Sequence, residues 1–199
     1  MQPKSLTSLL WAVAFLTSTW SVAVAETVDV ALGIDQTKVV SSQYKTQGVS
    51  GAQLQATYTR PMVGVWSLLA QYRMNFSNTL SAGLIGINYD TDELQTKGGA
   101  IAPDGKAEIV RNPVWVLRSF LAFGAFRYVD TLESNNANLG NKNRVPVQAD
   151  LYGLSFGVGL HHLFNESWGC HSTIEYSIAS AENFGISSTS LVFGGLFRY

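Results

Sequence analysis

The sequence predicts an all-β fold, a single antiparallel up-and-down transmembrane β-barrel of eight strands, with ten strands as the alternative. Three observations predict it: apolar and polar residues alternate along strand-like runs, the polar faces are small and uncharged, and charged residues are scarce. Charged residues make up 14% of the 199 residues, whereas soluble domains contain about 25%. An outer surface that faces lipid needs few charges, so this composition favours a barrel in a membrane.

Residues 1–25 are typical of a secretory signal peptide. The apolar core, Leu9–Leu16, is too short for a membrane-spanning helix, which needs about 20 residues. The small residues Ala23 and Ala25 suit a signal peptidase, which would cleave after Ala25. We therefore expect an exported protein in which residues 26–199 form the barrel.

Nine strand-like runs follow this segment, each with an alternation of period two. They cover residues 27–35, 50–60, 65–75, 80–90, 105–112, 114–129, 150–164, 169–180 and 187–199. Bacterial single-chain barrels have an even number of strands. The run 105–112 is the shortest and carries Lys106, Glu108 and Arg111, so we assign it to a loop.

The alternation has two physical meanings, because the apolar face of a strand can point into a protein core or out into lipid. Small uncharged polar faces suit a crowded barrel interior better than a solvated surface. Aromatic residues near strand ends, where a membrane interface would lie, also favour the barrel. These residues are Trp66, Trp115, Trp168 and Tyr199.

Connections between the runs carry turn residues. Arg60–Gly64 and Phe164–Trp168 are predicted to be tight turns, and residues 102–105 form a Pro-Asp-Gly turn. The polar segment Asp130–Arg144 is predicted to be a long loop, and residues 130–149 are the best candidate surface for interaction.

The C-terminal residues resemble the signal that the outer-membrane assembly machinery reads in Gram-negative β-barrels. Gly194, Phe197 and Tyr199 carry the likeness, although Val192 stands where that family prefers a polar residue. Residues 56–72 and 159–176 look like strand–turn–strand units of small OmpA-type and OmpX/Ail-type barrels. The resemblance implies a cell outer membrane location, the barrel-assembly machinery as partner, and contact with outer-membrane lipid and lipopolysaccharide. It implies no reaction.

Several charged side chains are predicted to point into the barrel. Glu175 and Arg198 do so in the phase of their strands, and we expect the same of Arg118 and Arg127. A buried charge must be paired, because an isolated one is very costly. We favour internal ion pairs that plug the barrel over a selective pore.

His161 and His171 are predicted to face each other inside the barrel if Phe164 pairs with Trp168. Two such imidazoles could bind a transition metal or act as a pH switch. No third ligand is evident, so we predict hydrogen-bonded interior histidines, with neither a metal nor a cofactor.

Other chemistry is disfavoured by geometry and charge. His171 and Ser172 are neighbours on a strand and point to opposite faces, so no catalytic pair is predicted. Asp90, Asp92 and Glu93 lack the spacing of a calcium loop. A net charge of −1 does not favour nucleic acid as a partner, and the single Cys170 cannot form an internal disulfide.

These observations favour a non-enzymatic barrel with a structural, envelope-integrity or adhesin-like role that depends on its extracellular loops. A host or extracellular ligand is a candidate partner of those loops. The alternatives are a narrow channel for solutes or ions and a lipid A-modifying enzyme.

Overall fold

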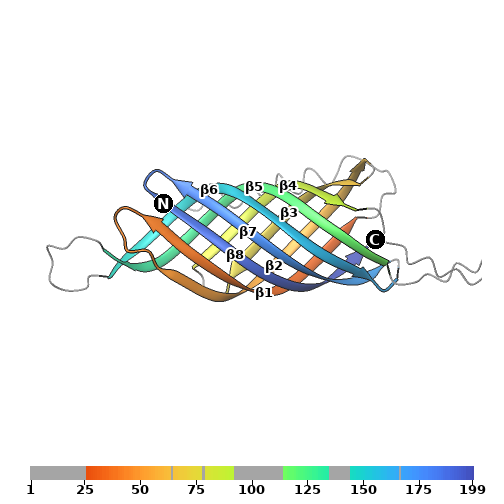
Figure 1. Cartoon of the computed structure of the whole chain (residues 1–199), viewed down its shortest axis with the longest axis horizontal. Helices are drawn as coiled ribbons and strands as arrows, with labels where there is room; N and C mark the ends of the chain where they lie inside the picture. The colour runs from red at the N-terminus through yellow and green to blue at the C-terminus, as the bar shows by residue number, and fades with distance from the viewer. Residues whose placement is uncertain (1–25, 64, 78, 92–113, 135–143, 166) are drawn as a thin grey trace, which may run out of the picture.

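The computed structural model describes residues 26–63, 65–77, 79–91, 114–134, 144–165 and 167–199, and these form eight strands in one closed barrel. Each strand pairs antiparallel with the next, and the last pairs with the first (Figure 1). The predicted fold is therefore confirmed. The strands are β1 (Thr27–Ser41), β2 (Gly48–Val63), β3 (Trp66–Asn75), β4 (Leu80–Asp90), β5 (Val114–Glu133), β6 (Arg144–Leu163), β7 (Trp168–Ala181) and β8 (Phe184–Arg198).

Apolar side chains face outward, as the barrel interpretation requires. On β1, Val30, Leu32 and Ile34 are 53%, 59% and 65% exposed, whereas their neighbours Ala31 and Asp35 are buried. The same phase holds on the other strands, and it places the lone Cys170 on the outer face of β7. In a soluble sandwich the burial would be reversed, so the outer wall is built to contact lipid. The described residues contain no helix that is long and apolar enough to span a membrane.

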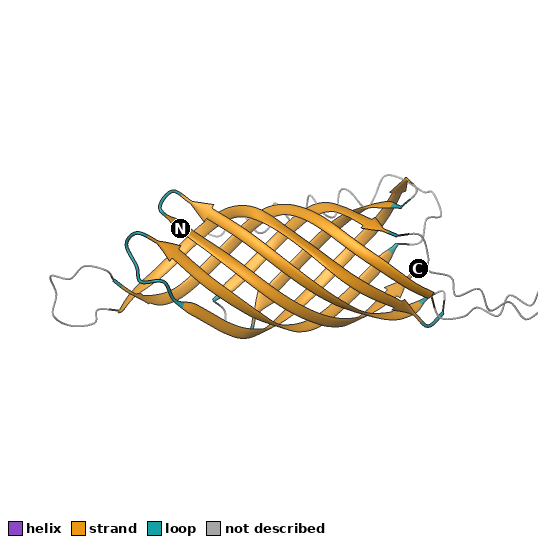
Figure 2. Ribbon diagram, in the orientation of Figure 1, coloured by secondary structure: helices purple, strands orange, loops and turns teal. Residues whose placement is uncertain are grey.

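Antiparallel order gives the barrel two distinct ends. The termini end carries Glu26 and Tyr199, whose backbones exchange hydrogen bonds of 3.0 Å, and the short connections after β2 and β6. The hairpin end carries the connections after β1, β3, β5 and β7. Figure 2 shows the described connections as short loops between long strands, which tilt strongly against the long axis of the barrel.

Aromatic side chains form a girdle at the termini end of the outer wall. Neighbouring strands contribute ring pairs with centroid distances of 4.1–5.0 Å, and the exposed rings extend toward the membrane interface. The pairs are Trp66 with Tyr89, Trp115 with His162, and Trp168 with Phe197.

The apolar band of the wall has the height of a membrane core. On β5 the outward residues between Trp115 and Arg127 are uncharged, and Arg127 is the first charged residue on that face. Arg127 lies twelve positions after Trp115. Strands rise about 3.3 Å per residue at a tilt near 45°, which gives a band of roughly 28 Å. Transmembrane barrels have an apolar band of about 25 Å.

The predicted boundaries were wrong at the hairpin end. Within the segment expected to be a loop, β5 continues to Glu133 and β6 begins at Arg144, with these two residues in register. Leu132 and Val147 are buried on the inner face of this ribbon. Polar residues indicated a loop, but strands that extend beyond the membrane can present polar residues to water. The described parts of the candidate surface 130–149 are therefore strand.

Some predictions fall outside the described residues. These are the signal peptide 1–25 with its cleavage residues Ala23 and Ala25, the run 105–112, the turn 102–105, and the acidic residues Asp92 and Glu93.

Candidate functional site

A polar network crosses the interior of the barrel and is centred on Glu175. Its carboxylate accepts hydrogen bonds from Gln55 Nε2 at 2.8 Å, Gln71 Nε2 at 3.0 Å and Arg73 at 3.3 Å. Arg73 also donates to Ser177, which donates to Ser155 at 2.9 Å. Because β3 and β7 stand on opposite sides of the eight-stranded ring, these bonds span the lumen.

Arg73 and Glu175 form an ion pair that is closed off from water. Their side chains are 2% and 0% exposed, and the Arg73 guanidinium also lies 5.3 Å from the centroid of the Phe126 ring. A buried pair needs further hydrogen bonds to offset the loss of water. The network supplies them to the Glu175 carboxylate and to one end of the Arg73 guanidinium, whereas Arg73 Nε has no hydrogen-bond partner among the described residues. The sequence analysis placed Glu175 inside but missed Arg73, although Gln71, Arg73 and Asn75 share one polar face of β3.

The other arginines differ in position. Arg118 points inward and makes a bidentate pair with Asp90, with contacts of 2.7 and 2.9 Å. Arg198 lies on the half-buried inner face of β8 at the termini end. Arg127, expected inside, lies on the outer face. The prediction was wrong because an odd separation from Arg118 puts the two side chains on opposite faces of one regular strand.

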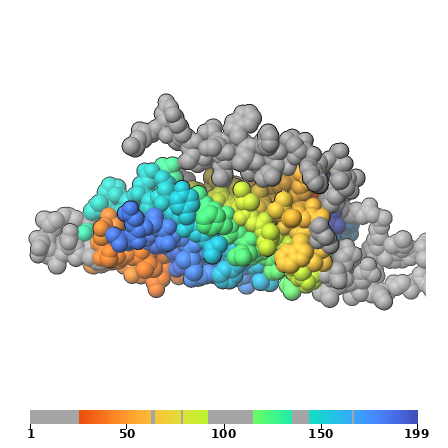
Figure 3. Space-filling view, turned by 90° about the horizontal axis from the view of Figure 1, so that it is seen from above, coloured from red at the N-terminus to blue at the C-terminus, as the bar shows by residue number. Residues whose placement is uncertain are grey.

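An apolar cluster fills the rest of the interior, mainly from β4, β5 and β6. Leu84, Phe126, Tyr128 and Leu151 are at most 1% exposed. The side chains of the strands also form a continuous outer wall over the part of the face visible in Figure 3. The polar network around Glu175 packs one side of the interior, and this apolar cluster packs the other.

The hairpin end is covered by what we call the cap, which consists of Tyr44, Lys45, Tyr128, Glu133 and Phe184. Tyr44 pairs with Ser134 in an isolated bridge, and the Lys45 backbone N–H donates to the Glu133 carbonyl at 3.0 Å. Tyr44 and Tyr128 both contact Phe184, with ring centroids 6.4 and 5.5 Å apart. Since β1 and β5 stand on opposite sides of the ring, the β1–β2 connection crosses the mouth of the barrel.

Two histidines lie inside the termini end. Phe164 donates to the Trp168 carbonyl at 2.9 Å, and this turn sets His161 opposite His171. Their rings stack with centroids 5.0 Å apart. His171 Nε2 lies 3.1 Å from an Asp29 carboxylate oxygen.

The contacts of His171 have the composition of a hydrolytic triad, since its Nδ1 lies 3.2 Å from the Thr173 hydroxyl. The surroundings leave no room for a substrate. A Cβ atom on Gly194 would lie 2.5 Å from His171 Nε2, and one on Gly159 would overlap the Thr173 hydroxyl. Ser172 points to the outer face, away from His171. Among the described residues, no three His, Cys, Asp or Glu side chains gather to hold a metal.

The three residues of the suggested assembly signal lie on two faces of the last strand. Gly194 faces inward against His171, whereas Phe197 and Tyr199 face outward with ring centroids 6.0 Å apart. Their role in assembly remains a prediction. The structure gives Gly194 a packing role of its own.

Comparison with known proteins supports the fold. No protein-family model and no curated protein matches the sequence. The crystal structure of Neisserial surface protein A is 12% identical, with a TM-score of 0.52, and the match covers 86% of this chain and 97% of that chain. The outer membrane protein OprG from Pseudomonas aeruginosa is 15% identical, with a TM-score of 0.46 and coverage of 88% and 97%. Ail of Yersinia pestis is 12% identical, with a TM-score of 0.42 and coverage of 87% and 98%. The likeness to Neisserial surface protein A supports the closed barrel fold of this chain.

Proposed function

We propose that this chain, with the fold of an outer-membrane β-barrel, is a non-conducting and non-enzymatic protein of the outer membrane. Its role would depend on the surface that the hairpin end presents, in envelope integrity or in attachment to a host or extracellular ligand. Export by a signal peptide and insertion by the barrel-assembly machinery belong to this proposal.

The closed interior is the observation that carries the proposal. The network around Glu175 crosses the lumen, the apolar cluster fills the space beside it, and the cap covers the hairpin end. Side chains nearly fill an eight-stranded barrel in general. A continuous water path would have to break a buried ion pair and displace aromatic rings, which favours a plugged barrel over a channel.

The two ends suggest an orientation. Barrels of this kind have short periplasmic turns and longer extracellular segments. At the termini end the connections after β2 and β6 are tight, and the connection after β4, residues 91–113, lies almost wholly outside the described residues. At the hairpin end β5 and β6 continue as a ribbon in which Glu133 pairs with Arg144. We therefore propose that the hairpin end faces outside. Its exposed residues include Arg144, Val145 and Gln148 on β6.

Planar-bilayer recording of the refolded protein tests the absence of a pore. We expect no reproducible single-channel steps, with a conducting porin in the same membranes as the positive control. Regular steps from the wild-type barrel would contradict the proposal and establish the channel alternative.

Mass spectrometry of lipid A tests the non-enzymatic part. We expect the same acyl pattern from cells with and without expression of the chain, because the histidine site lacks space for a substrate. A changed pattern that disappears in His171→Ala would show that the barrel modifies lipid.

A further inference from the structure

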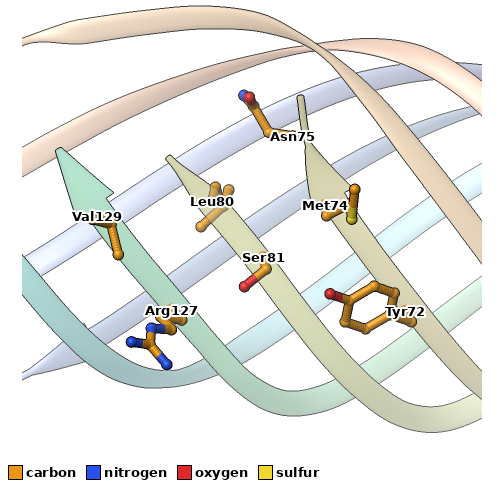
Figure 4. A pocket seen from close by; sticks show the side chains of 7 residues that line it. All are labelled: Tyr72, Met74, Asn75, Leu80, Ser81, Arg127 and Val129. Atoms are coloured by element: carbon orange, nitrogen blue, oxygen red, sulfur yellow. The ribbon is translucent and has the colours of Figure 1, made fainter. Parts of the chain in front are cut away.

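A depression of about 200 Å³ lies on the outer wall near the hairpin end, across β3, β4 and β5 (Figure 4). The outward residues that shape it are Tyr72, Met74, Ser81, Arg127 and Val129. These side chains point away from the lumen, whereas two further lining residues, Asn75 and Leu80, are buried on the inner face.

Small side chains in the register of three strands create the hollow. Met74, Ser81 and Arg127 lie side by side on β3, β4 and β5. Two residues closer to the membrane centre on each strand, Tyr72 lies beside Gly83, which in turn lies beside Ala125. The two long polar side chains, Tyr72 and Arg127, are therefore separated by residues that are too short to fill the space between them.

The depression combines one cation with two hydroxyl groups. Figure 4 shows the hydroxyl oxygens of Tyr72 and Ser81 on the side that faces Arg127. Within the described part of the chain, the Arg127 guanidinium makes no ion pair and no hydrogen bond. Five guanidinium N–H groups in a planar fork suit a phosphate, which they can bind with two parallel hydrogen bonds.

The position of Arg127 suits a lipid headgroup. It is the first charge beyond the apolar band of β5, so its guanidinium lies at the membrane interface, where the cost of an outward charge on a barrel falls away. Met74 and Val129 add apolar contact area to the same depression. A phosphate held here would stand above acyl chains that lie against the wall.

We infer that this depression binds the phosphate of a membrane lipid, with Arg127 as the charged partner and Ser81 and Tyr72 as hydrogen-bonding partners. In the orientation proposed above, the lipid is lipid A, the phosphorylated glycolipid of the outer leaflet. This choice of lipid depends on the orientation but not on the absence of a pore.

Asp150 moderates the site. It is in register with Arg127 on β6, on the side away from the depression, and it also faces outward. Its negative charge opposes the binding of an anion nearby. Removal of that charge should therefore strengthen the binding of phosphate.

Native mass spectrometry of the barrel released from phosphatidylcholine nanodiscs tests the inference. The nanodiscs contain a minor fraction of lipid A or of phosphatidylglycerol. We expect the wild type to retain lipid A in preference to phosphatidylglycerol. Retention should fall about tenfold in Arg127→Gln, as expected for the loss of charge-assisted hydrogen bonds. Asp150→Asn should retain more lipid A than the wild type.

Two further variants separate the site from general charge and from folding. Lys38→Gln removes another outward cation at the same end, on β1, and should retain lipid A like the wild type. Ser81→Leu keeps the charge and fills the depression, so it should lose retention. Heat-modified gel mobility identifies the folded barrels among all variants.

Four outcomes would overturn the inference. Equal retention by folded Arg127→Gln and wild type would exclude the arginine as a ligand. Equal losses in Lys38→Gln and Arg127→Gln would indicate unspecific charge attraction. Equal retention of phosphatidylglycerol and lipid A, or displacement of lipid by inorganic phosphate at equal concentration, would exclude lipid A as the occupant.

Discussion

The two sides of the barrel interior are equally well buried and are built from opposite chemistry. On one side, Glu175 and Arg73 are joined to amides and hydroxyls from β2, β3, β6 and β7. On the other, Phe126 and Leu151 belong to an apolar cluster. The polar side depends on each group having its partner, whereas the apolar side depends on filled volume. The two sides should therefore respond to truncation by different mechanisms.

The largest effect is expected from Glu175→Ala. Removal of the carboxylate leaves the buried Arg73 cation unpaired, which costs about 3–5 kcal/mol of the free energy of unfolding. Urea titration of the refolded barrel in detergent, followed by tryptophan fluorescence, measures this. In the double variant Arg73→Met, Glu175→Leu, most of the stability should return because no charge is left unpaired. A double variant less stable than Glu175→Ala would contradict this account of the polar side.

Leu151→Ala tests the apolar side in the same titration. Loss of a fully buried aliphatic side chain leaves a cavity, which costs about 3 kcal/mol. Leu151 is in register with Phe126, whose ring lies 5.3 Å from the Arg73 guanidinium, so the two sides share a contact. The loss of stability in the double variant with Glu175→Ala should therefore differ from the sum of the two single losses. Strict additivity would show that the two sides are independent.

Gly194→Ala is expected to have a smaller effect, about 1–3 kcal/mol, because a new methyl group would lie 2.5 Å from both His171 Nε2 and the Val30 carbonyl oxygen. Gly195→Ala is the matched control, since a Cβ atom there has its nearest contact at 4.0 Å. If the two variants lost equal stability, close packing against His171 and Val30 would not explain the glycine. A defect in insertion of Gly194→Ala, with normal stability after refolding, would instead support the assembly signal.

Lys45→Ala should have the smallest effect. The Lys45–Glu133 pair of 3.3 Å is exposed at the lysine, and exposed pairs contribute about 0.2–1 kcal/mol. Lys38→Ala is the control without this partner. A loss above about 2 kcal/mol would show that the cap stabilises both sides of the interior rather than only covering them.

The period-two pattern predicted which face of its strand a residue occupies, but it could not predict which residues contact each other across the barrel. Alternation put Glu175, His161 and His171 on the inner face, where the structure has them, because neighbouring residues on a strand point to opposite sides. The same pattern could not identify Arg73 as the partner of Glu175. That contact joins strands on opposite sides of the ring, and it depends on how the sheet closes.

Errors at the hairpin end had a different origin. Hydrophobic alternation is imposed on the outer face by lipid, so it ends where the lipid ends, although the strands continue. Asp130 and Arg144 therefore indicated a loop, whereas the described residues on both sides belong to a paired ribbon. Arg127 lies at this boundary. Because Arg118 points inward and the two residues are an odd number of positions apart, strict alternation along β5 requires Arg127 to point outward.

The Arg73–Glu175 pair also has a consequence for biogenesis. Arg73 lies in the third strand and Glu175 in the seventh, so about one hundred residues of chain separate the cation from its counter-charge. A barrel truncated before β7 keeps an unneutralised guanidinium directed at its own interior. The last two strands therefore neutralise Arg73 as well as close the hydrogen-bonded ring. Assembly intermediates that lack β7 contain a buried unpaired charge and are less stable than the complete barrel.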